Sequence, residues 1–193
     1  MMNEGRASAT RKPRADAVRN RLRLLATAKA VFAAKGSNAS LDEIAQIAGV
    51  GAGTLYRHFP TRDALVVAVY RNETEQLAAA ADRLAEAHPP VEAFREWLLL
   101  FFNYVATKHG MQELLNSILM SADLRSESML QINKAVAKLV DGAIASGDIR
   151  PDIDPKDLLF ALIGVAKFSS GSDREQTAKR LVDILIKGVQ IPK

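Results

Sequence analysis

Apolar residues recur at intervals of three and four along most of the chain, which places them on one face of an α-helix. Between Asp16 and Lys35 this spacing predicts an amphipathic helix, and Gly36 follows it as expected at a helix C-terminus. No stretch of the sequence shows the sustained alternation of apolar and polar residues that a half-buried strand requires. The pattern therefore predicts an all-α protein with about nine helices.

Helix-start signals divide the next part of the sequence. The segment 40–43 (SLDE) has the form of a capping box, in which the serine oxygen accepts from a free backbone N–H and the glutamate returns a second bond. It opens a short helix that ends at Gly49, and a third helix is expected over 51–59, before a proline. Thr61 is then expected to cap a long fourth helix that reaches about Ala87.

A Pro-Pro pair at 89–90 is the clearest break in the chain, and helical spacing resumes after it. The later segments expected to be helical are 91–108, 111–121, 127–146, 155–169 and 173–190. We expect three parts: a mobile basic arm (1–15), a three-helix N-terminal head (16–61) and a C-terminal helical bundle (62–193).

Charge is distributed unevenly along the chain. The first 71 residues hold twelve Lys/Arg and five Asp/Glu, a net +7, whereas the rest hold fourteen and seventeen, a net −3. A basic front part favours contact with a polyanion such as a nucleic acid, although an unevenly charged solvated surface would give the same balance. The chain has no cysteine and its three histidines are far apart, so no metal site and no cofactor are expected. The longest apolar run, 158–166, is far shorter than the ~20 residues of a membrane helix, so no membrane partner is expected.

The glycine-rich stretch GVGAG (49–53) raises two possibilities, a phosphate-binding loop or the turn of a helix-turn-helix unit. A dinucleotide-binding loop requires a preceding strand and the spacing GxGxxG, whereas this stretch follows a capped helix and lacks that spacing. In a helix-turn-helix unit, Gly49 permits the sharp turn and the small Ala45 lies where two helices cross. We therefore interpret 40–59 as a helix-turn-helix unit, whose second helix fits the major groove of DNA.

The second helix of this unit has two faces and a distinctive leading end. Leu55 and Phe59, four residues apart, are expected to point into the core. The residues that then point outward are Thr54, Arg57 and His58, with Tyr56 at the edge. The leading end consists of Gly51, Ala52 and Gly53. Their lack of bulk lets the backbone approach a DNA surface closely, and the N–H groups of a helix N-terminus favour phosphate.

The segment 28–66 resembles the DNA-binding region of the TetR family of bacterial transcriptional regulators. The resemblance is carried by F-x-x-K-G before the first turn, S-L-D-E-I-A at the second helix, and G-V-x-x-G-T-L-Y-x-H-F at the turn and third helix. It covers about the first third of the chain, and the remainder matches only in helical content and length. The resemblance implies a cytoplasmic homodimeric regulator, in the first instance a repressor, that binds a palindromic double-stranded DNA operator and is released by a small-molecule effector.

The resemblance also implies roles for individual residues. Ser40 and Tyr56 would contact phosphates, Ala52 and Thr54 would face base edges, and His58 would reach the DNA backbone. Arg62 occupies a position where the family often has a basic residue near phosphate. The DNA-binding residues expected are therefore Ser40, Gly51, Ala52, Gly53, Thr54, Tyr56, Arg57, His58 and Arg62. Other members often carry a longer side chain within 51–53, so base reading here would depend on Thr54, on a thymine-methyl contact and on DNA shape. The arm either adds DNA contacts or serves as a solubilising tail.

In the bundle, an aromatic stripe of Trp97, Phe101 and Tyr104 is either core or the wall of an effector pocket. Asn116 and Met120 are the candidates for a polar anchor and a flexible lining. The absence of a basic-aromatic cluster favours an uncharged or hydrophobic effector.

The last two long helices have wide apolar faces, and family members dimerise there. The expected interface residues are Leu158, Leu162, Val165, Leu181 and Leu185.

Three other classes of protein compete with this interpretation. An architectural or effector-independent DNA-binding protein is the main alternative, and a pair of half-sites in a footprint would argue against it. An enzyme is not expected, because Asp152, Asp154 and Asp157 lie around a helix start, where they cap the helix and complement its dipole. A helical interaction module would not require the outward-facing residues of the third helix.

Overall fold

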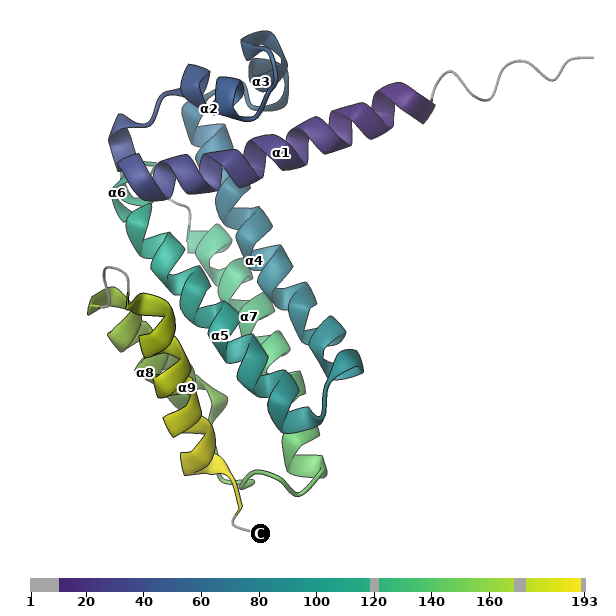
Figure 1. Ribbon diagram of the computed structural model, residues 1–193, viewed down its shortest axis with the longest axis vertical. Helices are drawn as coiled ribbons and strands as arrows, with labels where there is room; N and C mark the ends of the chain where they lie inside the picture. The colour runs from purple at the N-terminus through teal and green to yellow at the C-terminus, as the bar shows by residue number, and fades with distance from the viewer. Residues whose placement is uncertain (1–10, 119–121, 169–172, 192–193) are drawn as a thin grey trace, which may run out of the picture. The chain divides into compact units, whose positions relative to one another are not determined.

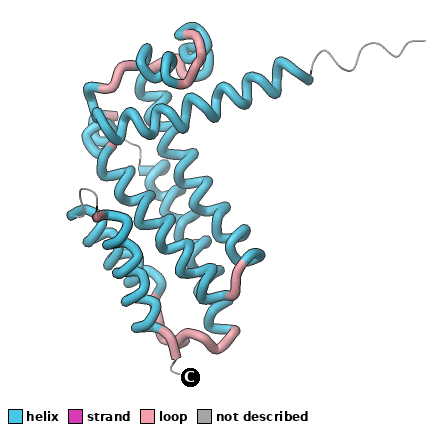
Figure 2. Tube along the Cα trace, in the orientation of Figure 1, coloured by secondary structure: helices cyan, strands magenta, loops and turns pink. Residues whose placement is uncertain are grey.

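The computed structural model describes residues 11–118, 122–168 and 173–191. These residues form nine α-helices and one 3-10 turn, with no strand beyond an isolated bridge, and the trace is helical almost throughout (Figures 1 and 2). The all-α prediction is confirmed. The elements are α1 (Arg11–Lys35), η1 (Gly36–Asn38), α2 (Leu41–Ile47), α3 (Ala52–His58), α4 (Arg62–Ala87), α5 (Pro90–Gly110), α6 (Gln112–Ser117), α7 (Ala122–Ala145), α8 (Pro155–Phe168) and α9 (Arg174–Val189).

The described residues fall into two compact units. The head unit contains the chain up to Tyr70 together with Gly110–Ile118, so it holds α1, α2, α3, the first part of α4, and α6. The bundle unit contains Arg71–His109 and the chain beyond Ile118, and it holds the rest of α4, nearly all of α5, and α7 to α9. The compact head is therefore larger than the segment 16–61 and is not one continuous piece of chain.

Local capping and apolar spacing build the head unit. The Ser40 hydroxyl accepts from the Glu43 backbone N–H at 3.5 Å, and the Thr61 hydroxyl accepts from the Ala64 N–H at 3.1 Å. The Glu43 carboxylate accepts a bond from Lys35 Nζ at 2.5 Å, so only the serine half of the expected capping box is formed by these side chains. The buried side chains of the head core are Leu24, Leu25, Phe32, Ile44, Leu55, Phe59 and Leu65, with Met111, Leu114 and Leu115 from the second segment.

The start of α1 differs from the prediction. The helix begins at Arg11, so residues 11–15, expected in the mobile arm, are helical, and Pro13 is tolerated because it lies in the first turn. Val18 and Leu22, two of the apolar residues that give the segment 16–35 its helical spacing, are at least half exposed. Within the head unit, the first half of α1 runs beyond α2 and α3, so these helices do not cover it (Figure 1).

The bundle unit is organised around α5, which lies between α9 and α4 in Figure 1. Its buried apolar side chains belong to the core of the unit. The Trp97 indole N–H donates to the Leu77 carbonyl at 2.9 Å and thereby joins α5 to α4. The Arg95 guanidinium contacts Asp183 at 2.7 Å and joins α5 to α9, and this hydrogen bond raises the pKa of Arg95. At the start of α8, the Asp154 carboxylate accepts from the Lys156 N–H at 2.9 Å, the capping role expected for this residue.

Candidate nucleic-acid interface

The turn between α2 and α3 depends on Gly49. Its φ is +65°, in the left-handed region that glycine enters without strain. The turn is closed by bonds from the Gly49 N–H to Gln46 O at 3.0 Å and from the Val50 N–H to Ala45 O at 3.0 Å. A Cβ at Gly49 would lie 2.7 Å from Nη2 of Arg23, so the α1 side chain also occupies the space beside the turn. The expected role of Gly49 is confirmed.

The buried face of α3 is as the spacing predicts, whereas on its outward face Tyr56, expected at the edge, is more exposed than Thr54 and His58. Leu55 and Phe59 are buried in the head core. On the opposite side, Tyr56 is 46% exposed and Arg57 is exposed, whereas Thr54 and His58 are half-buried. The Arg57 Nε donates to the Gly53 carbonyl at 3.2 Å, which holds its side chain along the helix. The solvent face of α3 therefore presents a phenol, a guanidinium, an imidazole and a hydroxyl.

Gly51 and Gly53 differ from Gly49 in their surroundings. A Cβ at either position would meet no atom within 4 Å, and neither has a positive φ. Gly51 is the N-cap of α3 with φ −69°, a conformation open to any residue. The head itself therefore gives no steric reason for glycine at these exposed positions. A steric reason for glycine would be the close approach of an external surface to the helix backbone.

Arg62, predicted to lie near a phosphate, makes several contacts within the head unit. Its guanidinium donates to Ala39 O at 2.6 Å, to Ser37 O at 2.8 Å and to Gly36 O at 3.2 Å, and it lies over the Phe32 ring at 5.5 Å. The side chain thus holds the connector between α1 and α2 against the start of α4. We propose that Arg62 acts as a positioning residue for this connector, and its predicted DNA contact stays a prediction.

Two arginines of α1 contact the ends of the turn and of α3, and neither contact was predicted from the sequence. Arg21 lies over the Phe59 ring at 5.4 Å, and Arg23 lies beside Gly49. Both contacts join residues far apart in sequence, so helical spacing could not reveal them. Ser40, expected to contact phosphate, is exposed at the N-terminus of α2.

A basic head with a tight turn and an outward-facing short helix defines a helix-turn-helix DNA-binding protein. Residues 24–69 match the family described as bacterial regulatory proteins, tetR family, and residues 89–191 match the one described as transcriptional regulator SbtR-like, C-terminal domain. The chain belongs to the TetR family of bacterial transcriptional regulators.

Individual relatives agree with this assignment. The solved TetR transcriptional regulator SCO0520 from Streptomyces coelicolor is 41% identical, and the match covers 90% of this chain and 99% of that one with a TM-score of 0.84. The transcriptional regulator RutR of Escherichia coli K12 is 28% identical over 128 residues, 63% of this chain and 59% of RutR. The probable acrEF/envCD operon repressor of the same organism is 27% identical over 124 residues, 63% of this chain and 56% of that protein. The chain thus spans less than two thirds of these two curated relatives.

Of the residues expected to form an effector pocket, the three aromatic ones come together in the core of the bundle unit. Trp97 and Phe101 are buried and stacked with ring centroids 5.7 Å apart, as core residues. Tyr104 is buried with its hydroxyl 3.2 Å from that of Thr74. Asn116 is exposed and belongs to the head unit, and Met120 lies outside the described residues. The structure instead has a cavity between α4 and α7, lined by other residues.

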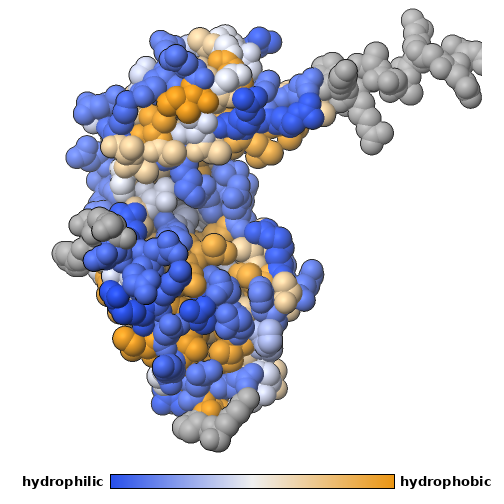
Figure 3. All heavy atoms as spheres, in the orientation of Figure 1, coloured by the Kyte–Doolittle hydropathy of each residue, from blue (hydrophilic) through white to orange (hydrophobic). Residues whose placement is uncertain are grey.

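The residues expected at the dimer interface differ in burial. Leu158 and Leu162 are buried in the core of their own bundle unit and offer little surface to a partner. Val165, Leu181 and Leu185 are partly buried against the same core. The large exposed apolar side chains of α8 and α9 are Phe160, 63% exposed, and Ile184, 65% exposed. In the face drawn in Figure 3, hydrophobic areas lie among hydrophilic ones in the region of these helices. Within the described residues, no helix combines the length and apolar character needed to cross a membrane.

Proposed function

We propose that this TetR-family regulator is a cytoplasmic repressor that binds a palindromic operator as a homodimer and releases it on binding a small-molecule effector. The observation that carries the DNA-binding part is the leading end of α3. Gly51 and Gly53 are exposed and have no steric role within the head, yet they directly precede the exposed polar face of the helix. A helix of this form can approach the edges of base pairs in a major groove with its backbone.

The proposed contacts follow the exposure of each residue. Thr54 and Ala52 contact base edges, the first through its hydroxyl and the second through a thymine methyl group. Tyr56 and Ser40 contact phosphates on either side of the groove, because both side chains are exposed and each carries a hydroxyl. Arg57 and His58 add charge or hydrogen bonds to the DNA backbone.

We place the dimer interface on α8 and α9. Phe160 and Ile184 are large apolar side chains that the bundle unit leaves in solvent, which favours burial against a second copy. A dimer carries two α3 helices. These can bind two half-sites whose centres lie one helical turn of DNA apart, or a multiple of one turn.

The effector acts through α4 in this proposal. This helix begins in the head unit at Arg62 and ends in the bundle unit at Ala87, so a shift of its later part is passed along one continuous helix. The effector must bind the released state more tightly than the DNA-bound state, by about 3 kcal/mol for a hundredfold loss of operator affinity.

The test is a selection of bound sites from random duplex DNA, followed by affinity measurements on the best site and its variants. We expect enrichment of an inverted repeat. Thr54→Ala should reduce the preference among sites by roughly 1–3 kcal/mol at one base position, whereas Tyr56→Phe should weaken binding to all duplexes to a similar extent.

Thr107→Ala on α5 serves as the matched control and should change neither quantity, because Thr107 is a half-buried threonine of the bundle unit. Selection without enrichment of any repeat would contradict operator binding. A single half-site, bound with equal affinity by a monomer, would favour the architectural alternative.

A further inference from the structure

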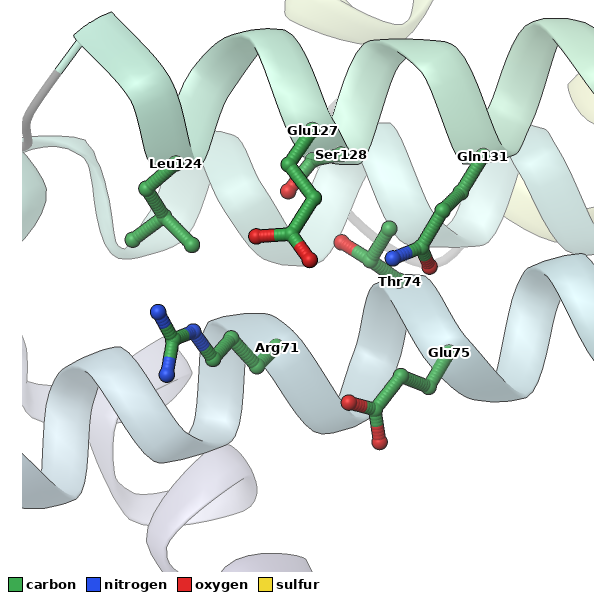
Figure 4. Close-up of a pocket in the computed structure, with 7 residues that line it drawn as sticks. All are labelled: Arg71, Thr74, Glu75, Leu124, Glu127, Ser128 and Gln131. Carbon is green, nitrogen blue, oxygen red and sulfur yellow. The ribbon is translucent and has the colours of Figure 1, made fainter.

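The bundle unit contains a cavity between α4 and α7 that the aromatic stripe does not form. Arg71, Thr74 and Glu75 line it from α4, and Leu124, Glu127, Ser128 and Gln131 line it from α7. Figure 4 shows the Arg71 guanidinium and the Glu127 carboxylate directed into the space between the helices, with the Gln131 amide near Thr74. Six of the seven lining residues are polar or charged. This composition is unlike that of an apolar core gap.

The floor of the cavity consists of two buried hydroxyls. Thr74 is 1% exposed and bonds to the Tyr104 hydroxyl at 3.2 Å. Ser128 is 4% exposed and lines the cavity. A serine hydroxyl can donate one hydrogen bond and accept others, so it can bond to a group that enters the cavity. Ser128 is therefore a hydrogen-bonding group that is available to an occupant.

The charged side chains at the rim of the cavity form no ion pairs within the described residues. Neither Arg71 nor Glu127 forms an ion pair with another described residue, although they have opposite charges and line the same cavity. Arg71 offers a planar set of donors that suits a carboxylate, and Glu127 offers acceptors that suit an ammonium group. The Gln131 amide can donate and accept beside them. Glu75, the third charged residue of the lining, is directed away from the space between the two helices in Figure 4. A ligand with one group of each charge complements Arg71 and Glu127, whereas a simple anion or cation would leave one of these two charges unmatched.

The volume favours a small ligand. The cavity measures about 170 Å³, close to the ~150 Å³ of a cavity that holds one benzene molecule. Sites for drug-sized ligands are typically about 300–1,000 Å³. A ligand of about the size of benzene fits this volume.

We propose that this cavity binds a small zwitterion of the α-amino acid class. Arg71 holds the carboxylate, Glu127 holds the ammonium group, and Ser128 donates from the floor. The assignment rests on the proposed function, in which this cavity is the effector site. It replaces the uncharged or hydrophobic effector that the aromatic stripe suggested.

The first test is calorimetric titration of the full chain, without DNA, with the twenty common amino acids one at a time. At least one of the smaller amino acids should bind with a Kd of about 1 mM or tighter, the affinity of a fragment-sized ligand. If that ligand is alanine, propionate and ethylamine should each bind at least tenfold more weakly, because each lacks one of its two charges. For another amino acid, the matched acid and amine take their place.

Variants then locate the ligand. Arg71→Gln and Glu127→Gln should each weaken binding at least tenfold, and Ser128→Ala should weaken it several-fold. Arg83→Gln and Asp141→Asn are the matched controls, because they are exposed on the same two helices but do not line the cavity. Both controls should bind as the unaltered chain does.

Absence of binding by every amino acid, or binding that is insensitive to Arg71 and Glu127, would overturn the proposal. Operator affinity is measured separately, with and without the amino acid that binds, and saturation should lower it at least tenfold. Binding that leaves operator affinity unchanged would overturn the effector role, while operator binding itself would stand. Failure to bind any operator would refute the proposed function without altering the calorimetric result.

Discussion

Gly49 and Gly53 lie four residues apart, and different physical requirements explain the two glycines. Gly49 has φ +65° and a neighbouring guanidinium where its Cβ would be, so the fold of the head requires it. Gly53 lies inside α3 with open space around it, so the fold would accept a side chain there. Substitutions at the two positions should therefore affect different properties of the protein.

At Gly49 we expect alanine to destabilise the head by about 1–2 kcal/mol, the cost of a left-handed conformation for a residue with a Cβ. Asparagine should cost less, because it tolerates this region better than alanine. Urea unfolding gives the two values. Gly36→Ala is the control for backbone strain alone, since Gly36 has φ +53° and no atom near its Cβ position. Equal stability of Gly49→Ala and the unaltered chain would contradict this account.

At Gly53 we expect alanine to raise the free energy of unfolding by roughly 0.5–1 kcal/mol, because alanine is the better helix former. The same change should lower operator affinity, since the added methyl group keeps the backbone of α3 away from the groove. Gly142→Ala, at an exposed and unobstructed position of α7, should give a similar gain in stability with no loss of affinity. Unfolding curves and fluorescence titration of the selected operator measure the two effects. A Gly53→Ala protein that is more stable and binds equally well would remove the argument for close approach.

At the scale of elements, Arg62 joins α4 to the connector between α1 and α2. Arg62→Ala should destabilise the chain by about 2 kcal/mol, because three backbone carbonyls lose a charged donor. Arg62→Lys should recover only part of this, since one ammonium group cannot reach three acceptors in the same geometry. Arg83→Ala, an exposed arginine on the same helix, should stay within about 0.5 kcal/mol of the unaltered chain.

The salt dependence of operator binding distinguishes this role from a phosphate contact. If Arg62 contacted a phosphate, removing it would reduce the salt slope by about one unit. We expect an unchanged slope for folded Arg62→Ala protein, which lacks the charge. A reduced slope would support the predicted DNA contact of Arg62.

The elements predicted best from the sequence are those bounded by local cap and turn signals. The caps at Ser40 and Thr61 and the turn at Gly49 placed α2, α3 and the start of α4 within one or two residues, because each signal acts on its own neighbours. The start of α1 was placed too late, since its first turns are polar and follow no apolar period. The start of α7 was placed at 127 rather than Ala122 for the same reason.

The candidate sites were harder to predict because they depend on tertiary packing. Apolar residues lie on most sides of α8, so their periodicity does not distinguish its buried side from its exposed side. Leu158 and Leu162 lie on the side that faces the core, and Phe160 lies on the side left in solvent. The cavity was missed because its polar residues from α4 and α7 lie about fifty positions apart and read as ordinary solvated faces. The spacing of a single helix carries no information about such pairings.

At the scale of the whole molecule, assembly should depend on the exposed apolar residues of α8 and α9. We expect the double variant Phe160→Ser, Ile184→Ser to sediment as a monomer at micromolar concentration while keeping its helical content, because neither side chain belongs to the core. Leu100→Ser, an exposed leucine on α5, should remain dimeric. Sedimentation velocity and circular dichroism measure both properties. A double variant that remains dimeric would exclude this surface.

The head unit is assembled from two separate stretches, because Gly110–Ile118 packs with the chain up to Tyr70. Met111, Leu114 and Leu115 from the later stretch are buried. A fragment that ends after Tyr70 would therefore expose apolar surface that α6 normally covers. A chimera that joins this head unit to the ligand-binding domain of another regulator must therefore contain both stretches. A single junction within α4 would give a chimera with an incomplete head core.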